Sequence, residues 1–219
     1  MQEKLVERKE AVDNIKDGMT IMIGGFMANG TPEKLMDAIV EKGVKNLTVI
    51  GNDAGLPGRG IAKLVEAGLV KKVITSHIGQ TPLTGQLMSE GKLEVELVPQ
   101  GSLIEKIRAG GAGLGGVLTP TGLGTDVAKG KDVVAIDGVD YLLEKPLKAD
   151  VAILRGSIVD KEGNIFYKGT TRNFNPVMAT AAELVIVGAE KVVEIGEIQG
   201  ENIVTPGIFV DYIVGGEEV

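Results

Sequence analysis

Residues 17–39 read DGMTIMIGGFMANGTPEKLMDAI, and this stretch sets the fold. An apolar run of strand length ends at Ile23, two glycines follow it, and a helical pattern begins after Gly30. Thr31 is a good N-cap, and Pro32 suits the first helical turn. The order of strand, glycine loop and helix N-terminus predicts a place where free backbone amides can hold a phosphate or a carboxylate.

This glycine loop also has a plain alternative, because most strand–glycine–helix turns of α/β proteins only reverse the chain. The stretch is not a P-loop, since no Gly-Lys-Ser or Gly-Lys-Thr follows the glycines. The residues by themselves leave both ligand binding and simple chain reversal open.

The rest of the chain alternates between strand-length apolar runs and helical patterns. Strands are predicted at residues 19–23, 47–50, 72–75, 94–98, 133–136, 151–154, 184–187 and 192–195. Apolar residues three and four apart predict helices around residues 35–40, 61–69 and 103–107. Continuous apolar strands between helices indicate an α/β fold with a doubly wound, mostly parallel sheet that is covered by helices on both faces.

No repeat, low-complexity tract or polar linker divides the sequence, so residues 1–219 are expected to form one domain. The glycine-rich stretch 110–125 is interpreted as an ordered loop inside that domain. Residues 160–166 (DKEGNIF) predict a β-turn that leads into a short strand.

Composition excludes several classes of function. The 219 residues contain no Cys and a single His at position 77, so thiolate nucleophiles and Cys- or His-rich metal sites are excluded and no metal is expected. The net charge is −7 without a basic block, which argues against a nucleic-acid partner. No apolar run is long enough to span a membrane, and the charged start MQEKLVERKE is not a secretory signal. We therefore expect a cytoplasmic protein without a membrane partner.

A longer motif lies within the opening stretch, namely Asp17-Gly18-x-x-Ile21-Met22-Ile23-Gly24-Gly25-Phe26-x-x-x-Gly30-x-Pro32. It resembles the first signature of the class I CoA-transferases at every fixed position. The likeness continues in GNDAG (51–55), EVELVPQG (94–101), IRAGG (107–111), TPTGLGT (119–125) and RNFN (172–175). The resemblance covers essentially the whole chain and implies the fold shared by CoA-transferases and sugar-phosphate isomerases.

Within that family, the sequence looks most like the alpha (A-type) subunits of the acetate/butyrate–acetoacetate CoA-transferases. The resemblance implies an enzyme that exchanges CoA between a short-chain acyl-CoA (acetyl-, butyryl- or acetoacetyl-CoA) and a free carboxylic acid. It implies no metal or redox cofactor, because CoA is itself a substrate. A 3-oxoacid enzyme of the succinyl-CoA or 3-oxoadipate type stays an alternative.

The same resemblance implies that the nucleophile is a Glu of a separate beta (B-type) subunit, where it lies in a Ser-Glu-Asn-Gly type motif and forms a glutamyl-CoA thioester. The nearest string here is Ser89-Glu90-Gly91, which lacks the Asn, and Glu90 is interpreted as a solvated helix-end carboxylate. We therefore expect the chain to be active only with its beta subunit, in an α₂β₂ or larger assembly.

The resemblance also assigns site residues to this chain. Asn52 would be an oxyanion donor, and the amide of Gln100 would contact the substrate carboxylate or the catalytic Glu. Without the resemblance, Asn52 is an Asx-turn residue and Gln100 a polar loop residue. The segment assigned to CoA or the acyl pocket is Gly24, Gly25, Phe26, Met27, Ala28, Asn29 and Gly30. Phe26 either walls that pocket or packs in the core or an interface.

Several other features are given structural interpretations. The glycines of residues 111–116 have dinucleotide-loop spacing, but they follow a helical pattern rather than a strand, so NAD binding is rejected. His77 is interpreted as a structural loop residue in preference to a proton carrier, and Arg108 as the partner of a nearby acid in preference to a CoA phosphate or a carboxylate. Contact of either residue with CoA stays an alternative. Arg59 and Lys63 are interpreted as a solvated helix face. Asn175 is interpreted as a helix cap before a proline.

Two further functions compete with the transferase. A sugar-phosphate isomerase of related fold would also use an anion site at a helix N-terminus, although no recognisable Asp/Glu base with a neighbouring Lys is present. A noncatalytic binding or regulatory protein is the third possibility.

Overall fold

The structure is a computed structural model that describes residues 3–217, so the ends of the expected 1–219 domain lie outside it. Its centre is an eight-stranded sheet in which all pairs are parallel except that of β9 with β8. The strands of this sheet are β1 (Thr20–Ile23), β2 (Leu47–Ile50), β3 (Val70–Thr75), β4 (Glu94–Leu97), β8 (Ala149–Asp160), β9 (Ile165–Phe166), β10 (Ala182–Val193) and β11 (Tyr212–Val214).

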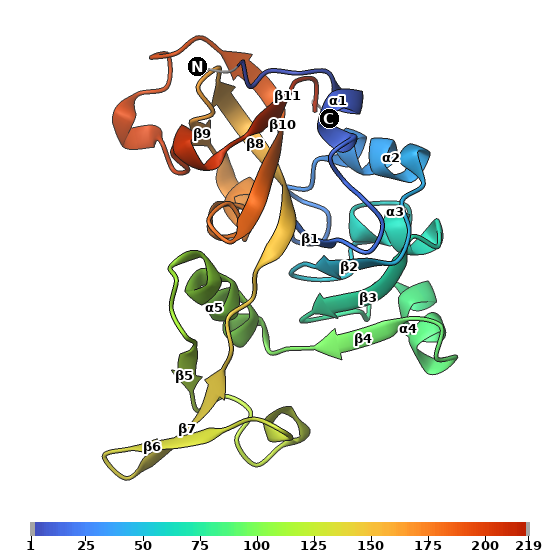
Figure 1. Cartoon of the computed structure of the whole chain (residues 1–219), viewed down its shortest axis with the longest axis vertical. Coiled ribbons are helices and arrows are strands. Elements are labelled where there is room, and N and C mark those ends of the chain that lie inside the picture. Colours follow the sequence, from blue (N-terminus) through green and yellow to red (C-terminus); the bar gives the residue numbers. More distant parts are fainter. Residues whose placement is uncertain (1–2, 218–219) are drawn as a thin grey trace.

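The strand order is β11-β10-β8-β1-β2-β3-β4 (Figure 1). From β1 the chain builds outward to β4 and then returns to lay β8, β10 and β11 on the other side of β1. The order therefore reverses between β1 and β8, and such a switch point in an open α/β sheet is where ligands bind beyond the carboxyl ends of the strands. The glycine loop begins there, because Gly24 follows β1 and its N–H donates to Ile153 of β8 at 3.0 Å.

Helices cover both faces of the sheet. They are α1 (Arg8–Val12), α2 (Glu33–Lys42), α3 (Ile61–Glu66), α4 (Pro82–Ser89), α5 (Gln100–Gly111) and α6 (Asn175–Met178). Short 3₁₀ turns η1 (Asp126–Ala128), η2 (Gly169–Arg172), η3 (Gly200–Asn202) and η4 (Gly207–Phe209) join other elements. Helices α1 to α4 pack in succession along one face, and α5 with α6 lie on the other (Figure 1).

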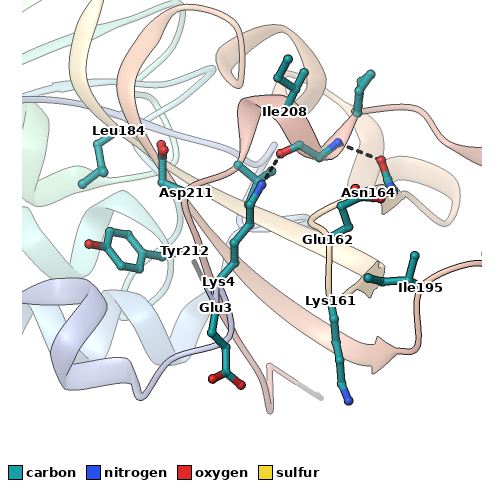
Figure 2. Close-up of a pocket in the computed structure, with 13 residues that line it drawn as sticks. Glu3, Lys4, Lys161, Glu162, Asn164, Leu184, Ile195, Ile208, Asp211 and Tyr212 are labelled. Atoms are coloured by element: carbon teal, nitrogen blue, oxygen red, sulfur yellow. Dashed lines mark hydrogen bonds between the residues drawn. The ribbon is translucent and has the colours of Figure 1, made fainter. Parts of the chain in front are cut away.

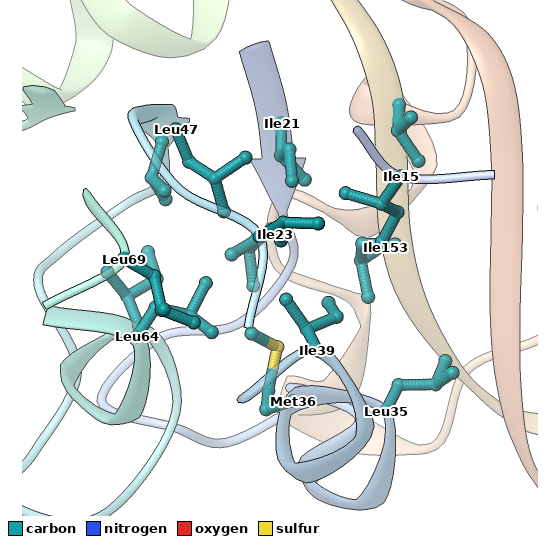
Figure 3. Packing of buried hydrophobic residues seen from close by; sticks show 14 of the residues in the cluster. Ile15, Ile21, Ile23, Leu35, Met36, Ile39, Leu47, Leu64, Leu69 and Ile153 are labelled. Atoms are coloured by element: carbon teal, nitrogen blue, oxygen red, sulfur yellow. The ribbon is translucent and has the colours of Figure 1, made fainter. Parts of the chain in front are cut away.

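Each face of the sheet has its own hydrophobic cluster, as strand alternation requires. Ile21 and Ile23 of β1 join the cluster under α1, α2 and α3, while Met22 between them joins the cluster under α5 and α6. Figure 3 shows Ile23 close to Met36 and Ile39 of α2, with Ile21 farther along β1 in the same cluster. Burying the hydrophobic stripe of α2 in this way fixes the helix that follows the glycine loop.

A second, three-stranded antiparallel sheet projects from the main body (Figure 1). It consists of β5 (Val117–Thr119), β6 (Val133–Ile136) and β7 (Val139–Glu144), in the order β5-β7-β6, and we call it the arm. At its base, the buried carboxylate of Glu144 lies 2.5 Å from Lys131 Nζ and 3.4 Å from Lys106 Nζ of α5. The pair with Lys106 attaches the arm to the helix that carries Gln100, whereas the pair with Lys131 lies within the arm segment itself.

The predicted fold class is confirmed, with differences in detail. Residues 133–136 form a strand, but it belongs to the arm and is exposed rather than buried in the main sheet. The strands predicted at 184–187 and 192–195 belong to one strand, β10, which ends at Val193 and pairs with β8 at ten positions, so residues 194 and 195 lie beyond it. The turn at 160–166 is confirmed as the β8–β9 connection, whereas the stretch 110–125 contains the end of α5 and strand β5 as well as loop. No helix within residues 3–217 is long and apolar enough to cross a bilayer.

Candidate active site

Asn52 and Gln100 meet at the carboxyl edge of the sheet. Asn52 lies two residues beyond β2, and Gln100 is the first residue of α5, which follows β4. The Nε2 group of Gln100 donates a hydrogen bond of 2.9 Å to Oδ1 of Asn52. The edge of a parallel sheet thus brings together two predicted site residues that are far apart in the sequence.

The side-chain amide of Asn52 is held so that its N–H₂ group is left to donate. Asn52 is only 4 % exposed, and its backbone carbonyl oxygen accepts both the N–H of Ser76 at 3.0 Å and the Ser76 hydroxyl at 2.6 Å. Gln100 occupies Oδ1, and within residues 3–217 no hydrogen bond engages Nδ2. An oriented neutral donor of this kind suits developing negative charge on an oxygen atom.

The glycine loop, residues 24–30, uses most of its backbone groups for its own folding. Phe26 and Asn29 exchange two backbone hydrogen bonds of 2.9 Å each, and Gly25 N–H donates to Asn173 Oδ1 at 3.0 Å. In the described part of the chain, only the N–H groups of Ala28 and Gly30 lack a partner in this loop. The loop therefore presents side chains rather than a cradle of amides, and Phe26 at its tip is 42 % exposed. Packing of Phe26 in the core is thus wrong.

The expectation that Thr31 caps the next helix, α2, is also wrong. The helix begins at Glu33 after Pro32, and the Thr31 hydroxyl donates instead to the carbonyl of Gly24 at 2.8 Å. The first amides of α2 are occupied by the carboxylate of Glu217, which accepts from Lys34 N–H at 3.0 Å and Leu35 N–H at 2.9 Å. The anion that the sequence predicts at this helix N-terminus is therefore present, but the chain supplies it.

Burial raises the pKa of the Glu217 carboxyl above its usual value, and the two helix amides oppose that rise. Arg8 and Arg155 face the same group and also favour its ionised form. The Glu217 carboxylate thus supplies the acceptor that the first backbone amides of α2 lack within the helix.

Two asparagine side chains donate hydrogen bonds to backbone carbonyls of the glycine loop. The Nδ2 group of Asn173 donates to the carbonyl of Asn29 at 3.0 Å, and that of Asn175 donates to the carbonyl of Gly30 at 3.0 Å. A Cβ atom on Gly24 would lie 1.8 Å from Oδ1 of Asn175, so only glycine fits there. Asn175 is thus the fully buried first residue of α6 and a support of the loop, and its assignment as a helix cap is wrong.

A second loop of the same design follows β2. Leu56 and Arg59 exchange backbone hydrogen bonds of 3.2 and 2.8 Å, as Phe26 and Asn29 do in the first loop. The flanking residues Gly55 and Gly60 have φ values of 81° and 63°, and α3 begins directly afterwards. We call residues 55–60 the second loop.

The other residues that the sequence singled out form ion pairs or lie exposed at the surface. Arg108 pairs with Glu105 at 2.9 Å on α5, and Glu90 is an exposed helix-end carboxylate with Lys92 at 2.8 Å, as predicted. His77 is an exposed residue after β3. Lys63 differs from the prediction, because it is mostly buried and pairs with Glu33 and Asp37 of α2 instead of facing solvent.

The glycines of residues 111–116 end α5 and lead into β5, so they open no helix, in agreement with the rejection of NAD binding. Within residues 3–217, no group of three His, Asp or Glu side chains is arranged to hold a metal ion. The chemistry that this edge offers is therefore hydrogen bonding by neutral amides.

A groove of about 860 Å³ lies elsewhere, beside β10 and β11 (Figure 2). Lys4 Nζ donates to the carbonyl of Gly207 at 2.7 Å, and Gly207 N–H donates to Asn164 Oδ1 at 2.8 Å across it. Since these polar groups satisfy one another, the groove offers less chemistry than the amide pair at the sheet edge.

A pair of neutral amides at the carboxyl edge of a mostly parallel sheet defines the protein as one of the doubly wound α/β class. The family model described as coenzyme A transferase matches residues 6–216. This chain belongs to the coenzyme A transferase family. The family and the enzyme class predicted from the sequence are thereby confirmed.

Curated relatives match over nearly their whole length. The chain is 55 % identical over 214 residues to the acetoacetyl-CoA:acetate/butyrate CoA transferase alpha subunit of Clostridium acetobutylicum, with 98 % of each chain covered. It is 50 % identical over 218 residues to the alpha subunit of the acetate CoA-transferase of Escherichia coli, covering 100 % of this chain and 99 % of that one. Both relatives are named alpha subunits.

A solved structure shows the same fold inside a longer polypeptide. The acyl-CoA transferase of E. coli O157:H7, in a thioester complex with CoA, matches with a TM-score of 0.85 and 25 % identity. The match covers 98 % of this chain but 47 % of that chain, so our protein spans about half of the longer enzyme.

The sequence pointed to Asn52 and Gln100, but Asn173, Asn175 and Glu217 carried no signal that linked them to the loop.

Proposed function

We propose that this chain is the alpha subunit of a heteromeric CoA-transferase and that its Asn52–Gln100 pair forms half of the active site. The observation that carries the proposal is the hydrogen bond of 2.9 Å from Gln100 to Asn52, which fixes a buried amide with its N–H₂ group available at the carboxyl edge of the sheet. The other half, including the nucleophilic Glu, belongs to a beta subunit. The name alpha subunit in both relatives supports this division.

The proposed reaction proceeds through covalent intermediates. The carboxylate of the beta-subunit Glu attacks the acyl-CoA carbonyl, so that an acyl-glutamyl anhydride forms and CoA leaves as a thiolate. The thiolate then attacks the glutamyl carbonyl, which releases the first acid and leaves a glutamyl-CoA thioester. The second acid reverses both steps. Each attack places negative charge on a carbonyl oxygen, and Asn52 Nδ2 donates to it.

The substrates we propose are a short-chain acyl-CoA (acetyl-, butyryl- or acetoacetyl-CoA) and a free short-chain acid. Support comes from the relative that is named for acetoacetyl-CoA, acetate and butyrate and from the one named for acetate. Phe26 and Met27 at the tip of the glycine loop are the apolar side chains that we expect to line the acyl pocket.

The test is to produce this chain alone and together with a beta subunit encoded beside it, and to follow CoA transfer from butyryl-CoA or acetoacetyl-CoA to labelled acetate. Transfer is expected only when both chains are present. A matched control uses a beta subunit whose Ser-Glu-Asn-Gly type motif carries Gln in place of Glu, and it should be inactive. Transfer by this chain alone, or its labelling by CoA in a thioester on one of its own glutamates, would contradict the proposal.

A further inference from the structure

The glycine loop and the second loop are two copies of one design that lie side by side. Both have a closed pair of backbone hydrogen bonds between flanking glycines, and both lead into a helix. A Cβ atom added to Gly60 of the second loop would meet the Cβ of Ala28 in the glycine loop at 3.5 Å. The rim of the site is therefore a pair of adjacent loops.

One buried carboxylate joins these two loops. Asp53 is 6 % exposed and follows Asn52 directly. Its Oδ2 accepts the N–H of Met27 at 2.8 Å, and its Oδ1 accepts the N–H of Gly55 at 2.7 Å. No Lys or Arg in residues 3–217 forms an ion pair with it, so these backbone amides are what stabilise the negative charge.

The glycine loop, to which Asp53 is hydrogen-bonded, has a strained backbone conformation. Met27 and Ala28 have φ values of 48° and 63°, in the left-handed region that non-glycine residues avoid. Such strain persists where surrounding contacts over-determine it, and it is common at functional sites. A bond from Asp53 to the N–H of Met27 itself is a contact of that kind.

A second connection runs the opposite way between the same loops. Glu33 at the start of α2, directly after the glycine loop, accepts the N–H of Gly60 at 3.0 and 3.2 Å. Asp53, just before the second loop, thus accepts an amide of the glycine loop, and Glu33, just after the glycine loop, accepts an amide of the second loop. Glu33 is partly exposed and also serves Lys63, whereas Asp53 is buried and serves only amides among the described residues.

We propose that Asp53 is a positioning residue, which fixes the strained tip of the glycine loop against the second loop and thereby sets the place of the adjacent Asn52 amide. The effect on catalysis rests on the proposed function, whereas the lock itself does not. Asparagine at this position keeps the size of the side chain but turns one of the two acceptors into a donor. That amide would face an N–H group and release one of the two loops.

The test compares Asp53→Asn with Asp160→Asn in the complex with the beta subunit. Asp160 is a buried control outside the site. Its Oδ1 accepts the backbone amides of Glu162 at 3.0 Å and Asn164 at 2.9 Å, and its Oδ2 accepts Nδ2 of Asn164 at 2.9 Å, so asparagine there also places a donor against a donor, but in the β8–β9 turn. A purely structural role predicts that both substitutions lower the thermal midpoint and leave kcat and KM unchanged. The proposal expects D53N alone to lower kcat, on the order of 10²-fold for a displacement near 1 Å, with a smaller change in KM.

A second measurement decides the lock independently of activity. Hydrogen–deuterium exchange should show faster exchange of residues 24–31 and 53–60 in D53N and of residues 160–166 in D160N. If the wild-type pair transfers no CoA, the proposed function fails and exchange still tests the lock. Unchanged exchange of residues 24–31 in D53N, or wild-type kcat in that variant, overturns the inference. Where D53N does not fold, Asp53→Ser provides the same comparison with one acceptor kept.

Discussion

Asn52 combines burial with an unused donor, which is unusual for an amide that serves only the fold. Replacement by Ala removes the Nδ2 donor and is expected to lower kcat by about 10²-fold, the usual loss for one oxyanion donor. Steady-state kinetics of the complex with the beta subunit measure the effect. Asn202→Ala, at an exposed asparagine in η3, is the control and should leave kcat unchanged. Near-normal turnover of the Asn52 variant would remove this amide from the site.

Tyr167 provides a prediction with a pH dependence. Burial raises the pKa of its phenol, even though the hydrogen bond of 2.8 Å with Thr205 and the charge of Arg172 act in the opposite direction. Above its ordinary value of 10.0 the unfolded chain loses this proton while the folded chain keeps it, so folding stability falls as the pH rises.

In Tyr167→Phe this pH dependence is absent, while the lost hydrogen bond costs about 1 kcal/mol near neutral pH. Urea unfolding should therefore find the variant less stable than wild type at neutral pH. As the pH rises above about 10, this difference in the free energy of unfolding should shrink by up to 1.4 kcal/mol per pH unit and then reverse. A constant difference across this range would contradict the assignment.

The loop after β1 keeps its shape only with glycine at position 24. Gly24→Ala would force a Cβ against Asn175 and is expected to destabilise the protein by about 1–3 kcal/mol, the usual cost of overpacking. Gly85→Ala in α4 is the control, because nothing lies within 4 Å of its Cβ position and alanine favours a helix. Thermal unfolding should move down for the first variant and not for the second.

The elements differ in how far their sequences reveal them. β1, β2 and α2 could be predicted because their apolar periods match the faces that they bury. Residues 133–136 have the same apolar run as a core strand, yet they lie exposed in the arm, and the sequence has no local mark of that difference. The sequence pattern divides strand β10 in two because residues 188–191 interrupt the apolar run, although the ladder with β8 includes Gly188, Ala189 and Lys191.

The candidate site shows the same limit. The resemblance to the family pointed to Asn52 and Gln100, and both follow parallel strands, whose carboxyl ends share one edge. The supports of the glycine loop could not be found, since Asn173 is 148 residues from Gly25 and Glu217 is 183 residues from Lys34. Short polar segments such as these have no period that points to a partner.

At the scale of the whole molecule, the arm depends on its anchor. Glu144 is 1 % exposed and neutralises two lysines, so Glu144→Gln leaves positive charges in a buried place at a cost on the order of 3 kcal/mol. Hydrogen exchange should accelerate in β5, β6 and β7 while β1 and β2 are unchanged. Glu105→Gln, which breaks the exposed pair with Arg108, should have little effect. Equal acceleration in both sheets would contradict a separately anchored arm.

Strand β8 has the opposite character to the arm. Its alternating residues Val151 and Ile153 enter the cluster beneath α2, and Ala152 and Leu154 enter the cluster beneath α5. Loss of either hydrophobic layer therefore exposes one face of β8, which both layers share. The two layers must unfold as a single cooperative unit, and the glycine loop and the second loop are rigid because the sheet that carries them is.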